Sequence, residues 1–331
     1  MIRPPRFWQS GNHIAAILLQ PAACAWSSVG RIRRQFTSSR KTPIPSICVG
    51  NVTIGGAGKT PTIIMLAAIL KDLGARPAIA IRGYGAARIT GVIRVDPQRQ
   101  DAVEVGDEAL LLARIAPCYV SRDRYAASLA AQADGATHIL YDDGLQNPQI
   151  AYDRAVLVVD GGYGFGNGRI IPSGPLRETP ARALARCQAM LIIGTDRYNC
   201  AVLAPAGMPV LHAELVPEHA TDFPRTEKFL AFAGIGRPEK FFASCRVAGL
   251  QLAETKEFPD HHPYAEAELI ALARRAAAQH ARLLTTAKDA VRLPPEWRDQ
   301  IAVFPVILHC ANPAALRHLL PVVSDAAPAA T

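Results

Sequence analysis

The chain has 331 residues, of which 50% are hydrophobic and 19% are charged. This balance excludes an intrinsically disordered protein, and the length predicts two domains. A formal charge of +8 is typical of proteins that bind nucleic acid, an anionic membrane surface or a phosphorylated substrate. The arginines lie singly or in short clusters and only 6% of the residues are aromatic, so we expect no nucleic-acid partner. Seven cysteines without a C-x-x-C spacing indicate reduced, buried thiols.

The first 35 residues combine an apolar segment with a basic cluster. Residues 14–26 are apolar but are interrupted by Gln20 and Pro21, and they are fewer than the roughly 20 apolar residues that cross a bilayer. The basic cluster that follows consists of Arg31, Arg33 and Arg34. This composition fits a helix that lies on an anionic membrane surface. It also fits a core helix with a solvated basic end.

A glycine-rich turn then separates a short apolar strand, at residues 44–49, from a helix expected at residues 63–73. Strand, glycine turn, Lys-Thr and helix in this order are typical of a P-loop, whose backbone N–H groups surround phosphate oxygens. We expect Lys59 to reach the β- and γ-phosphates and Thr60 to bind Mg²⁺. The residues expected to surround the nucleotide are Thr53, Gly55, Gly56, Ala57, Gly58, Lys59, Thr60 and Pro61. Thr53 departs from the generic motif, which has glycine at this position.

From residue 44 to about residue 215, apolar strands alternate with helices. The strands are expected at 77–81, 118–120, 137–141, 155–159 and 190–193, and helices between them at 107–115 and 124–133. This alternation predicts a parallel α/β sheet, which binds ligands at the carboxyl ends of its strands. Three arginines at such ends are candidates to bind a phosphate: Arg82, Arg122 and Arg124.

Two acidic residues follow the strand at 137–141. Asp142 has the position of a Walker-B-type aspartate, close to the Mg²⁺ that Thr60 would hold. Asp143 doubles the charge, and Gln146 adds an amide that could orient a ligand. The alternative is a turn stabilised by an aspartate pair.

Two further clusters carry titratable groups. Asp107 begins a helix, either as a capping residue or as a catalytic base. Asp260 precedes His261, and a carboxylate beside an imidazole raises its basicity. His262 should point away from His261, so we expect no metal shared by the two. The alternative is a polar cap before the next helix.

A proline-rich stretch at 205–224 indicates a boundary, and a second α/β pattern follows it. Strands are expected at 229–233, 282–286 and 301–308, and helices at 238–247, 266–280 and 311–320. We therefore divide the chain into an N-terminal membrane-contacting helix at 1–35, a P-loop core at 36–224 and a smaller α/β subdomain at 225–331.

The motifs together resemble those of the tetraacyldisaccharide 4′-kinase family of lipid A biosynthesis. The matching segments are 49–61, 82–85, 106–108, 142–146, 174–178, 258–262 and 286–290. A P-loop with Thr53 and with Pro61 after Lys-Thr is itself similar to that family. The chain departs from the pattern at Asn147, where histidine is expected, and at Ala86, where a basic residue is common.

The resemblance implies a P-loop NTPase-like, mostly parallel sheet flanked by helices, with a smaller C-terminal α/β subdomain and a membrane-associating N-terminal helix. It implies an ATP- and Mg²⁺-dependent lipid kinase that phosphorylates the 4′-hydroxyl of an acylated disaccharide 1-phosphate to give lipid IVA. The implied place is the cytoplasmic face of the inner membrane, as a peripheral protein with an anionic membrane surface and no obligatory protein partner.

The same resemblance implies roles for individual residues. Catalysis is assigned to Asp107, His261, Lys59 and Asp142, and the metal to Thr60 and Asp142. Asp143, Gln146 and Glu178 would contact the nucleotide. Arg82, Arg122 and Arg124 would bind the acceptor or the transferred phosphate.

Two other functions remain open from the residues alone. One is a P-loop GTPase of the metallochaperone class, although the chain has no Asn-Lys-x-Asp motif for guanine. The other is a non-enzymatic membrane adaptor that uses nucleotide as a structural ligand.

Overall fold

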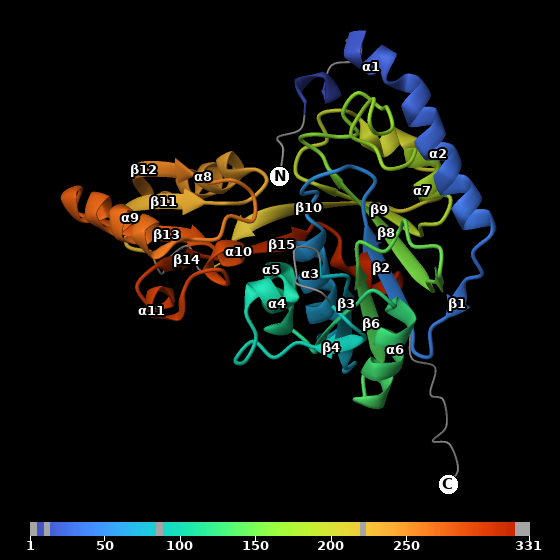
Figure 1. Ribbon diagram of the computed structural model, residues 1–331, viewed down its shortest axis with the longest axis horizontal. Coiled ribbons are helices and arrows are strands. Elements are labelled where there is room, and N and C mark those ends of the chain that lie inside the picture. Colours follow the sequence, from blue (N-terminus) through green and yellow to red (C-terminus); the bar gives the residue numbers. More distant parts are fainter. Residues whose placement is uncertain (1–4, 10–13, 84–88, 219–222, 322–331) are drawn as a thin grey trace.

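A nine-stranded sheet forms the larger part of the molecule (Figure 1). The structure is a computed structural model that describes residues 5–9, 14–83, 89–218 and 223–321. In spatial order the strands are β15 (Val306–Cys310), β10 (Val210–Pro217), β9 (Ala189–Ile193), β8 (Arg154–Asp160), β2 (Ser46–Gly50), β6 (His138–Asp142), β3 (Pro77–Ile81), β5 (Cys118–Ser121) and β4 (Val92–Arg94). Neighbours pair in parallel except β15 with β10 and β4 with β5 at the two edges. The mostly parallel sheet predicted from the sequence is therefore confirmed.

The central strands are buried on both faces, because helices cover both sides of a parallel sheet. Ile47 and Val49 of β2 pack against α3 (Lys59–Asp72) and α5 (Asp107–Ala113). Cys48, between them, packs on the opposite face against α7 (Pro180–Leu184). The two-residue period of the strand thus separates the α3 and α5 side of the sheet from the α7 side.

Helix α3 begins at Lys59, four residues before the start at 63 that the sequence predicts. The apolar segment on which this expectation rested follows the first turn, which contains Lys59, Thr60 and Pro61. Proline is tolerated in a first helical turn, where its missing N–H has no partner to lose. The early start places Lys59 and Thr60 directly at the helix N-terminus.

A smaller four-stranded parallel sheet forms the second part of the molecule. Its strands in order are β12 (Gln251–Glu257), β11 (Lys228–Ala233), β13 (Ala281–Thr286) and β14 (Ala302–Phe304). Phe229 on β11 packs toward α8 (Pro238–Val247), and Phe232 packs toward α9 (Glu266–Ala278) on the other face. The remaining elements are η1 (Arg6–Trp8), β1 (Arg40–Lys41), α4 (Ala102–Val105), α6 (Arg124–Ala133), β7 (Ile150–Ala151), η2 (Cys200–Leu203), α10 (Ala287–Ala290), α11 (Pro295–Arg298) and α12 (Pro313–His318).

The chain crosses between the two sheets twice. The single strand expected at 301–308 was wrong: Pro305 separates β14, in the small sheet, from β15, in the large one. Proline has no N–H to donate to a ladder, so the chain changes sheets there. The proline-rich stretch at 205–224 also contains β10, which pairs with β9 and β15. The domain limits at residues 35 and 224 remain a prediction, since they concern which segments fold as units.

A buried carboxylate links the two parts on one side. Asp160, at the end of β8, is 8% exposed and accepts hydrogen bonds from Lys240 Nζ at 2.6 Å and from Arg237. Both cations lie at the beginning of α8 in the smaller part. Since a buried carboxylate requires such partners, this contact fixes the smaller sheet against the carboxyl end of the larger one.

Helices α1 (Ile14–Leu18) and α2 (Gln20–Gln35) run along the outer edge of the larger part (Figure 1). Gln20 and Pro21, which interrupt the apolar segment of the sequence, lie in the first turn of α2, and the two helices meet at Leu19. Ser173 Oγ donates to the Ala16 carbonyl at 2.5 Å and thereby holds α1 to the core. In the described part of the chain, no helix is both long and apolar enough to cross a membrane.

Candidate active site

The loop between β2 and α3 has the geometry of a phosphate-binding turn. Gly55 and Gly58 have φ values of 111° and 91°, which favour glycine. A Cβ on Gly58 would lie 2.4 Å from Ile193 Cδ1, whereas nothing lies within 4 Å of such an atom on Gly55 or Gly56. The loop therefore leaves open space beside Gly55 and Gly56, next to the N-terminus of α3, where the first N–H groups of a helix can bind an anion.

Lys59 reaches back across this loop. Its Nζ lies 3.3 Å from Asn51 Oδ1 and 3.9 Å from Asp143 Oδ2. Thr60 follows in the first turn and is partly exposed, and Pro61 continues the helix. Asn51 was not among the residues predicted from the sequence, because an asparagine after a strand has no distinctive signal.

Two of the predicted nucleotide residues face inward instead. Thr53 is 8% exposed, forms a bridge with Leu176 and accepts hydrogen bonds from Asn51 Nδ2. Ala57 is 4% exposed. The structure thus gives Thr53 a role in holding the loop in place, and this explains how the chain can lack the usual glycine there.

Asp142 and Asp143 have opposite environments although they are adjacent. Asp142 ends β6 and is 2% exposed, and its Oδ1 has no hydrogen-bond partner among the described residues. Burial and the nearby Glu108 carboxylate raise the pKa of Asp142 to about 7, although Lys59 opposes this. Among the described residues Asp142 forms no ion pair, so its buried oxygen atoms fit a divalent cation such as Mg²⁺.

Asp143 turns the other way, with a φ of 51°. Its two oxygens accept hydrogen bonds from Arg177 Nη1 at 2.9 and 2.7 Å. Burial disfavours its charge, but Lys59 and Arg177 outweigh burial and hold the pKa of Asp143 below its ordinary value. Asp143 therefore positions two cations at the P-loop and stays ionised.

Gln146 and Glu178 meet beside the same loop. Gln146 Nε2 donates to the Asn51 carbonyl at 2.9 Å and to Glu178 Oε1 at 3.2 Å. Arg186 Nη2 donates to the same Glu178 oxygen at 2.7 Å. The structure brings these two predicted residues together next to the P-loop, and their contact with nucleotide remains a prediction.

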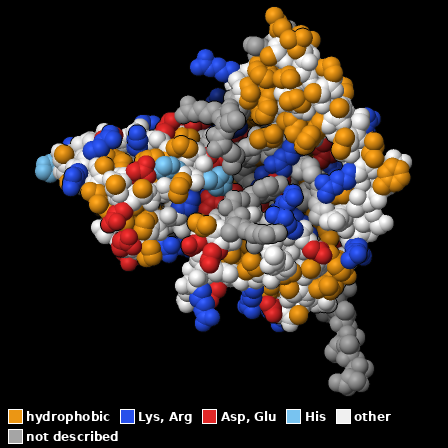
Figure 2. Space-filling model, viewed as in Figure 1, with side chains coloured by type: hydrophobic (Ala, Val, Ile, Leu, Met, Phe, Trp, Pro, Cys, Tyr) orange, Lys and Arg blue, Asp and Glu red, His pale blue; other side chains and the backbone are white. Residues whose placement is uncertain are grey.

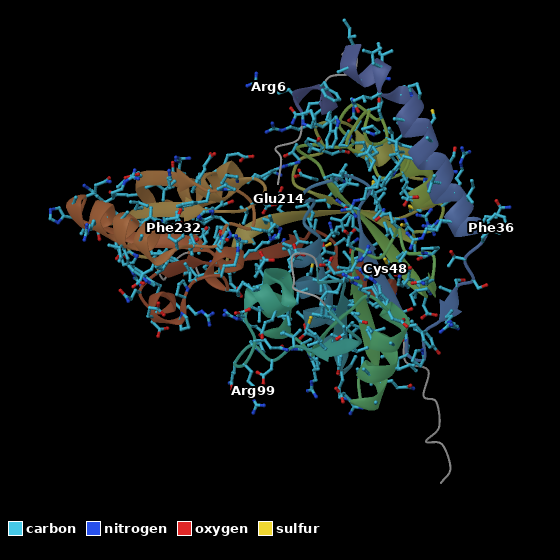
Figure 3. All side chains as sticks on the ribbon, viewed as in Figure 1. Arg6, Phe36, Cys48, Arg99, Glu214 and Phe232 are labelled. Carbon is cyan, nitrogen blue, oxygen red and sulfur yellow. The ribbon has the colours of Figure 1, made fainter. Side chains whose placement is uncertain are left out.

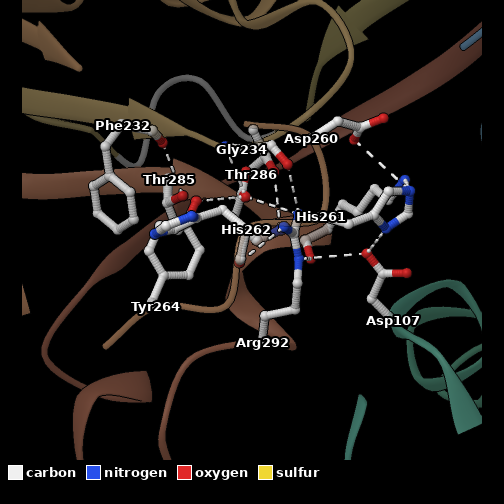
Figure 4. Close-up of polar contacts among 12 residues, drawn as sticks. Asp107, Phe232, Gly234, Asp260, His261, His262, Tyr264, Thr285, Thr286 and Arg292 are labelled. Atoms are coloured by element: carbon white, nitrogen blue, oxygen red, sulfur yellow. Dashed lines mark hydrogen bonds and ion pairs between the residues drawn. The ribbon is translucent and has the colours of Figure 1, made fainter. Parts of the chain in front are cut away.

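Asp107 lies between the two parts of the molecule (Figure 4). It begins α5 and is 5% exposed, and its Oδ2 lies 2.8 Å from His261 Nδ1 and 3.3 Å from Arg292 Nε. Burial acts to raise the pKa of Asp107. The hydrogen bond from His261 and the charge of Lys288 act in the opposite direction and outweigh burial, so the pKa lies below its ordinary value. Asp107 is therefore an ionised carboxylate with a histidine partner, which can accept a proton.

His261 lies closer to Asp107 than to Asp260, which precedes His261 in the sequence. Its Nε2 is 3.8 Å from Asp260 Oδ1 and 3.4 Å from Lys288 Nζ. His262 points elsewhere, to Glu268 at 2.8 Å, as the sequence predicted. The dyad is thus Asp107–His261, with Asp260 at the far side of the ring (Figure 4).

Lys288 and Arg292, next to this dyad, were not among the site residues predicted from the sequence. Lys288 Nζ donates to Glu108 Oε1 at 3.1 Å, and Arg292 bonds to Asp289 at 2.8 Å as well as to Asp107. Burial lowers the pKa of Lys288, but Glu108 and Asp107 outweigh it and raise that pKa above its usual value. The segment 286–290 was a signal for Lys288, but its partner on α5 could be found only from the fold.

The predicted arginines divide into two kinds. Arg82 and Arg122 follow β3 and β5, which are neighbours in the sheet, and both are exposed. Arg124 is 4% exposed and donates to the Asp143 carbonyl at 3.3 Å, behind the aspartate turn. Arg124 therefore supports the turn from inside, whereas Arg82 and Arg122 lie at the surface of the sheet edge. Ala86 lies outside the described residues.

This arrangement defines a P-loop phosphotransferase. It combines an anion-binding turn, a lysine, a buried carboxylate suited to a divalent cation and a separate carboxylate–histidine dyad that can accept a proton.

The comparison with known families is specific. The family model for tetraacyldisaccharide-1-P 4′-kinase matches residues 15–324, so the chain belongs to this family. The tetraacyldisaccharide 4′-kinase of Gluconacetobacter diazotrophicus is 47% identical over 324 residues, which cover 98% of each chain. The one of Rhodospirillum centenum is 47% identical and covers 96% of each chain.

A solved structure has the same fold. It is LpxK from Aquifex aeolicus in complex with ATP, which superimposes with a TM-score of 0.75 at 24% identity. The match covers 92% of this chain and 98% of that one. The fold predicted from the sequence resemblance is thereby confirmed.

The contrast between Asp142 and Asp143 leads to a prediction for the metal-free protein. Because the fold raises the pKa of Asp142 from 3.8 to about 7, its charge destabilises the folded state increasingly as the pH rises through that window. We expect Asp142→Asn to increase the free energy of unfolding, by an amount that grows from pH 4 to pH 7 and then levels off. Urea unfolding in the presence of a chelator measures this.

Asp143→Asn is the matched control. It leaves the partly buried cations Lys59 and Arg177 without their carboxylate, and we expect the free energy of unfolding to fall by about 1–3 kcal/mol. Equal effects of the two substitutions would contradict the different environments of the two carboxylates.

Proposed function

We propose that this protein transfers the γ-phosphate of ATP to the 4′-hydroxyl of an acylated glucosamine disaccharide 1-phosphate, giving lipid IVA. The observation that carries the proposal is the dyad of buried Asp107 and partly exposed His261, in a chain that also has a P-loop and is 47% identical to proteins of this name. A P-loop alone serves hydrolysis as well as transfer. A separate carboxylate that accepts a proton favours an alcohol as the acceptor.

The nucleotide half of the site follows from the P-loop. The N–H groups of residues 55–60 would surround the phosphates, and Lys59 would neutralise the β- and γ-phosphates. Thr60 and Asp142 are the residues that would hold Mg²⁺, which supplies charge neutralisation at the transferred phosphate when bound. Gln146 and Glu178 would contact the nucleotide from the far side of Asn51.

The acceptor half depends on Asp107. The 4′-oxygen forms a bond to the γ-phosphorus, the bond to the β,γ-bridging oxygen breaks, and ADP leaves. The hydroxyl proton goes to the Asp107 carboxylate, which His261 Nδ1 orients at 2.8 Å. Arg82 and Arg122 at the sheet edge would bind the anionic acceptor, while Arg124 acts from behind the aspartate turn.

An apolar face on the N-terminal helices supports contact with a membrane. Side chains that recur at helical spacing on α1 and α2 are exposed: Ile14 73%, Leu18 74%, Trp26 55%, Val29 65%, Ile32 55% and Phe36 81%. Figure 2 shows hydrophobic side chains at the top of the molecule, where α1 lies, and Figure 3 shows Phe36 pointing outward at the end of α2. A helix with this face would lie in the interface of a bilayer. We propose a peripheral protein at the cytoplasmic face of the inner membrane.

Removing the dyad carboxylate should reduce turnover specifically. We expect Asp107→Asn to lower kcat at least about 100-fold with little change in the KM for ATP, since general-base catalysis contributes about that much. An ATP-dependent assay on the tetraacyl disaccharide 1-phosphate measures both constants, with a soluble sugar as control acceptor. A large rise in the KM for ATP at unchanged kcat would make Asp107 a nucleotide-binding residue instead.

Lys59→Ala should abolish phosphorylation of the lipid while the protein remains folded, because the lysine charge acts on the phosphates being separated. Circular dichroism establishes that the fold is retained. Wild-type turnover in this variant would refute the assignment of the P-loop.

Replacing the apolar face should release the protein from membranes. For Val29, Ile32 and Phe36 changed to asparagine together, we expect vesicle binding to fall about 100-fold, at roughly 1 kcal/mol per partly inserted side chain. The control replaces Val202 and Val247, which are 77% and 86% exposed elsewhere on the surface, and should leave binding unchanged. Equal loss in both variants would contradict a membrane role for α2.

A further inference from the structure

A cavity lies behind α2, between this helix, the segment 168–170 and the beginning of α7. Its volume is about 390 Å³, which exceeds the space that a single phosphate group needs. Three arginines line it: Arg31, Arg169 and Arg182. The other lining residues are Gln20, Ala23, Cys24, Ser27, Gly168, Ile170 and Thr179, so no acidic side chain contributes to the wall.

The three arginines bond only to neutral oxygens. Arg169 Nη1 donates to Gln20 Oε1 at 3.1 Å, and Arg182 Nη1 donates to Ser27 Oγ at 3.3 Å. Arg31 Nη2 donates to Ser28 Oγ at 2.9 Å. Among the residues that the structure describes, none of the three forms an ion pair. Since each guanidinium has five donors, most of their hydrogen-bonding capacity is available to an anion.

A neighbouring cavity provides a contrast. It has a volume of about 290 Å³ and is lined by Arg34 and Arg186, but Arg186 is neutralised by Glu178 at 2.7 Å. Arg34 and Arg186 also both donate to the Leu145 carbonyl. The arginines of this second cavity therefore hold the protein together, whereas those behind α2 lack a partner of opposite charge.

The cavity lies on the inner side of the helix whose outer side is apolar. Successive residues of a helix turn by about 100°, so the lining residues of α2 share one face. These residues are Gln20, Ala23, Cys24, Ser27 and Arg31. Trp26, Val29 and Phe36 lie on the opposite face. A helix is about 10–12 Å wide and sinks about 5–10 Å into an interface, so its inner face lies at the level of the lipid phosphates.

We propose that this cavity binds the phosphodiester head group of an anionic membrane phospholipid, as a lipid site separate from that of the acceptor. The inference rests on the membrane contact proposed above. Three guanidinium groups can bind phosphate oxygens bidentately, and the Ser27 and Thr179 hydroxyls add donors. The result is a membrane anchor that selects for charge, in addition to the apolar face that does not.

The position of the cavity separates it from catalysis. It is lined by α7 and by the inner face of α2, and α7 packs on one face of the large sheet. Helices α3 and α5, which carry Lys59 and Asp107, pack on the other face. A lipid held behind α2 would therefore leave the acceptor site free.

Cys24 offers a direct readout, because it lines the cavity and is exposed while the other six cysteines are buried. The full-length protein is bound to vesicles of phosphatidylcholine alone or with phosphatidylglycerol, and the bound fraction is measured in each sample. We expect phosphatidylglycerol to slow maleimide labelling of bound protein at Cys24 about fivefold, as the occupied fraction of the cavity increases. Vesicles doped with the acceptor lipid, and inorganic phosphate without lipid, are expected to leave the rate unchanged.

The variant Arg31→Gln, Arg169→Gln, Arg182→Gln should lose this protection and keep kinase activity in neutral detergent micelles. The matched control changes three exposed arginines and should keep the protection: Arg99, which lies far from α2 in Figure 3, and Arg274 and Arg282, which belong to α9 and β13 of the smaller part. Arg31→Gln alone, which breaks only a contact with Ser28, should lose part of it and serves if the triple variant fails to fold.

Four results would overturn the inference: equal labelling in both vesicle types, retained protection in a folded triple variant, equal protection by inorganic phosphate, or protection by the acceptor lipid alone. The last two would assign the cavity to a free anion or to the substrate. Failure of the kinase proposal is distinguishable, because it shows as absent turnover with protection by phosphatidylglycerol intact. Failure of the membrane contact shows as a low bound fraction in both vesicle types.

Discussion

The active site depends on one buried contact between the two parts of the chain. Asp107 belongs to the larger part, and the groups that contact its carboxylate, His261 and Arg292, belong to the smaller one, 154 residues or more along the chain. Asp107 and Arg292 have side chains that are 6% and 5% exposed, so separating them would leave an uncompensated charge in a nearly dry environment. The surroundings of the Asp107 carboxylate therefore depend on the docking of the smaller part. Asp160 with Arg237 and Lys240 holds the same two parts together at another point.

The same principle separates the roles of the two adjacent aspartates. The Asp143 carboxylate already has two cationic partners, Arg177 and Lys59, so its charge is compensated within the protein. Asp142 is more deeply buried and has an oxygen with no partner, which costs stability unless a cation binds. A protein retains such a cost where function requires it. Within the described part of the chain, Asp142 has an unpaired buried oxygen, whereas both oxygens of Asp143 are paired. Asp142 is therefore the carboxylate that is available to a metal ion.

The sequence was informative where chemistry depends on local order. The P-loop, the aspartates after β6 and the helix at Asp107 were all located by neighbours in the chain. Arg177, Lys288 and Arg292 carry their roles through partners far away, so only the fold could reveal them. The prediction of one strand at 301–308 was wrong because it rested on apolar character alone. That character does not show that the proline divides the segment into two strands of different sheets. Thr53 was assigned to the nucleotide by its position in a motif, and this assignment remains a prediction; the structure adds that Thr53 is buried and bridges Leu176.

The ion pairs show which arginines leave the net charge of +8 uncompensated. Arg177, Arg186 and Arg292 each form an ion pair with a carboxylate, so their charges add little to the electrostatic potential outside the protein. The arginines behind α2 have no such partner among the described residues, and they stand on the side of a helix whose other face is apolar. An apolar face gives adhesion without regard to lipid charge, while unpaired guanidinium groups discriminate between head groups. Because a helix is about 10–12 Å wide, the apolar outer face of α2 and the arginines behind it, of which Arg31 belongs to the helix and Arg169 and Arg182 to the segments it covers, can meet acyl chains and phosphates at the same time.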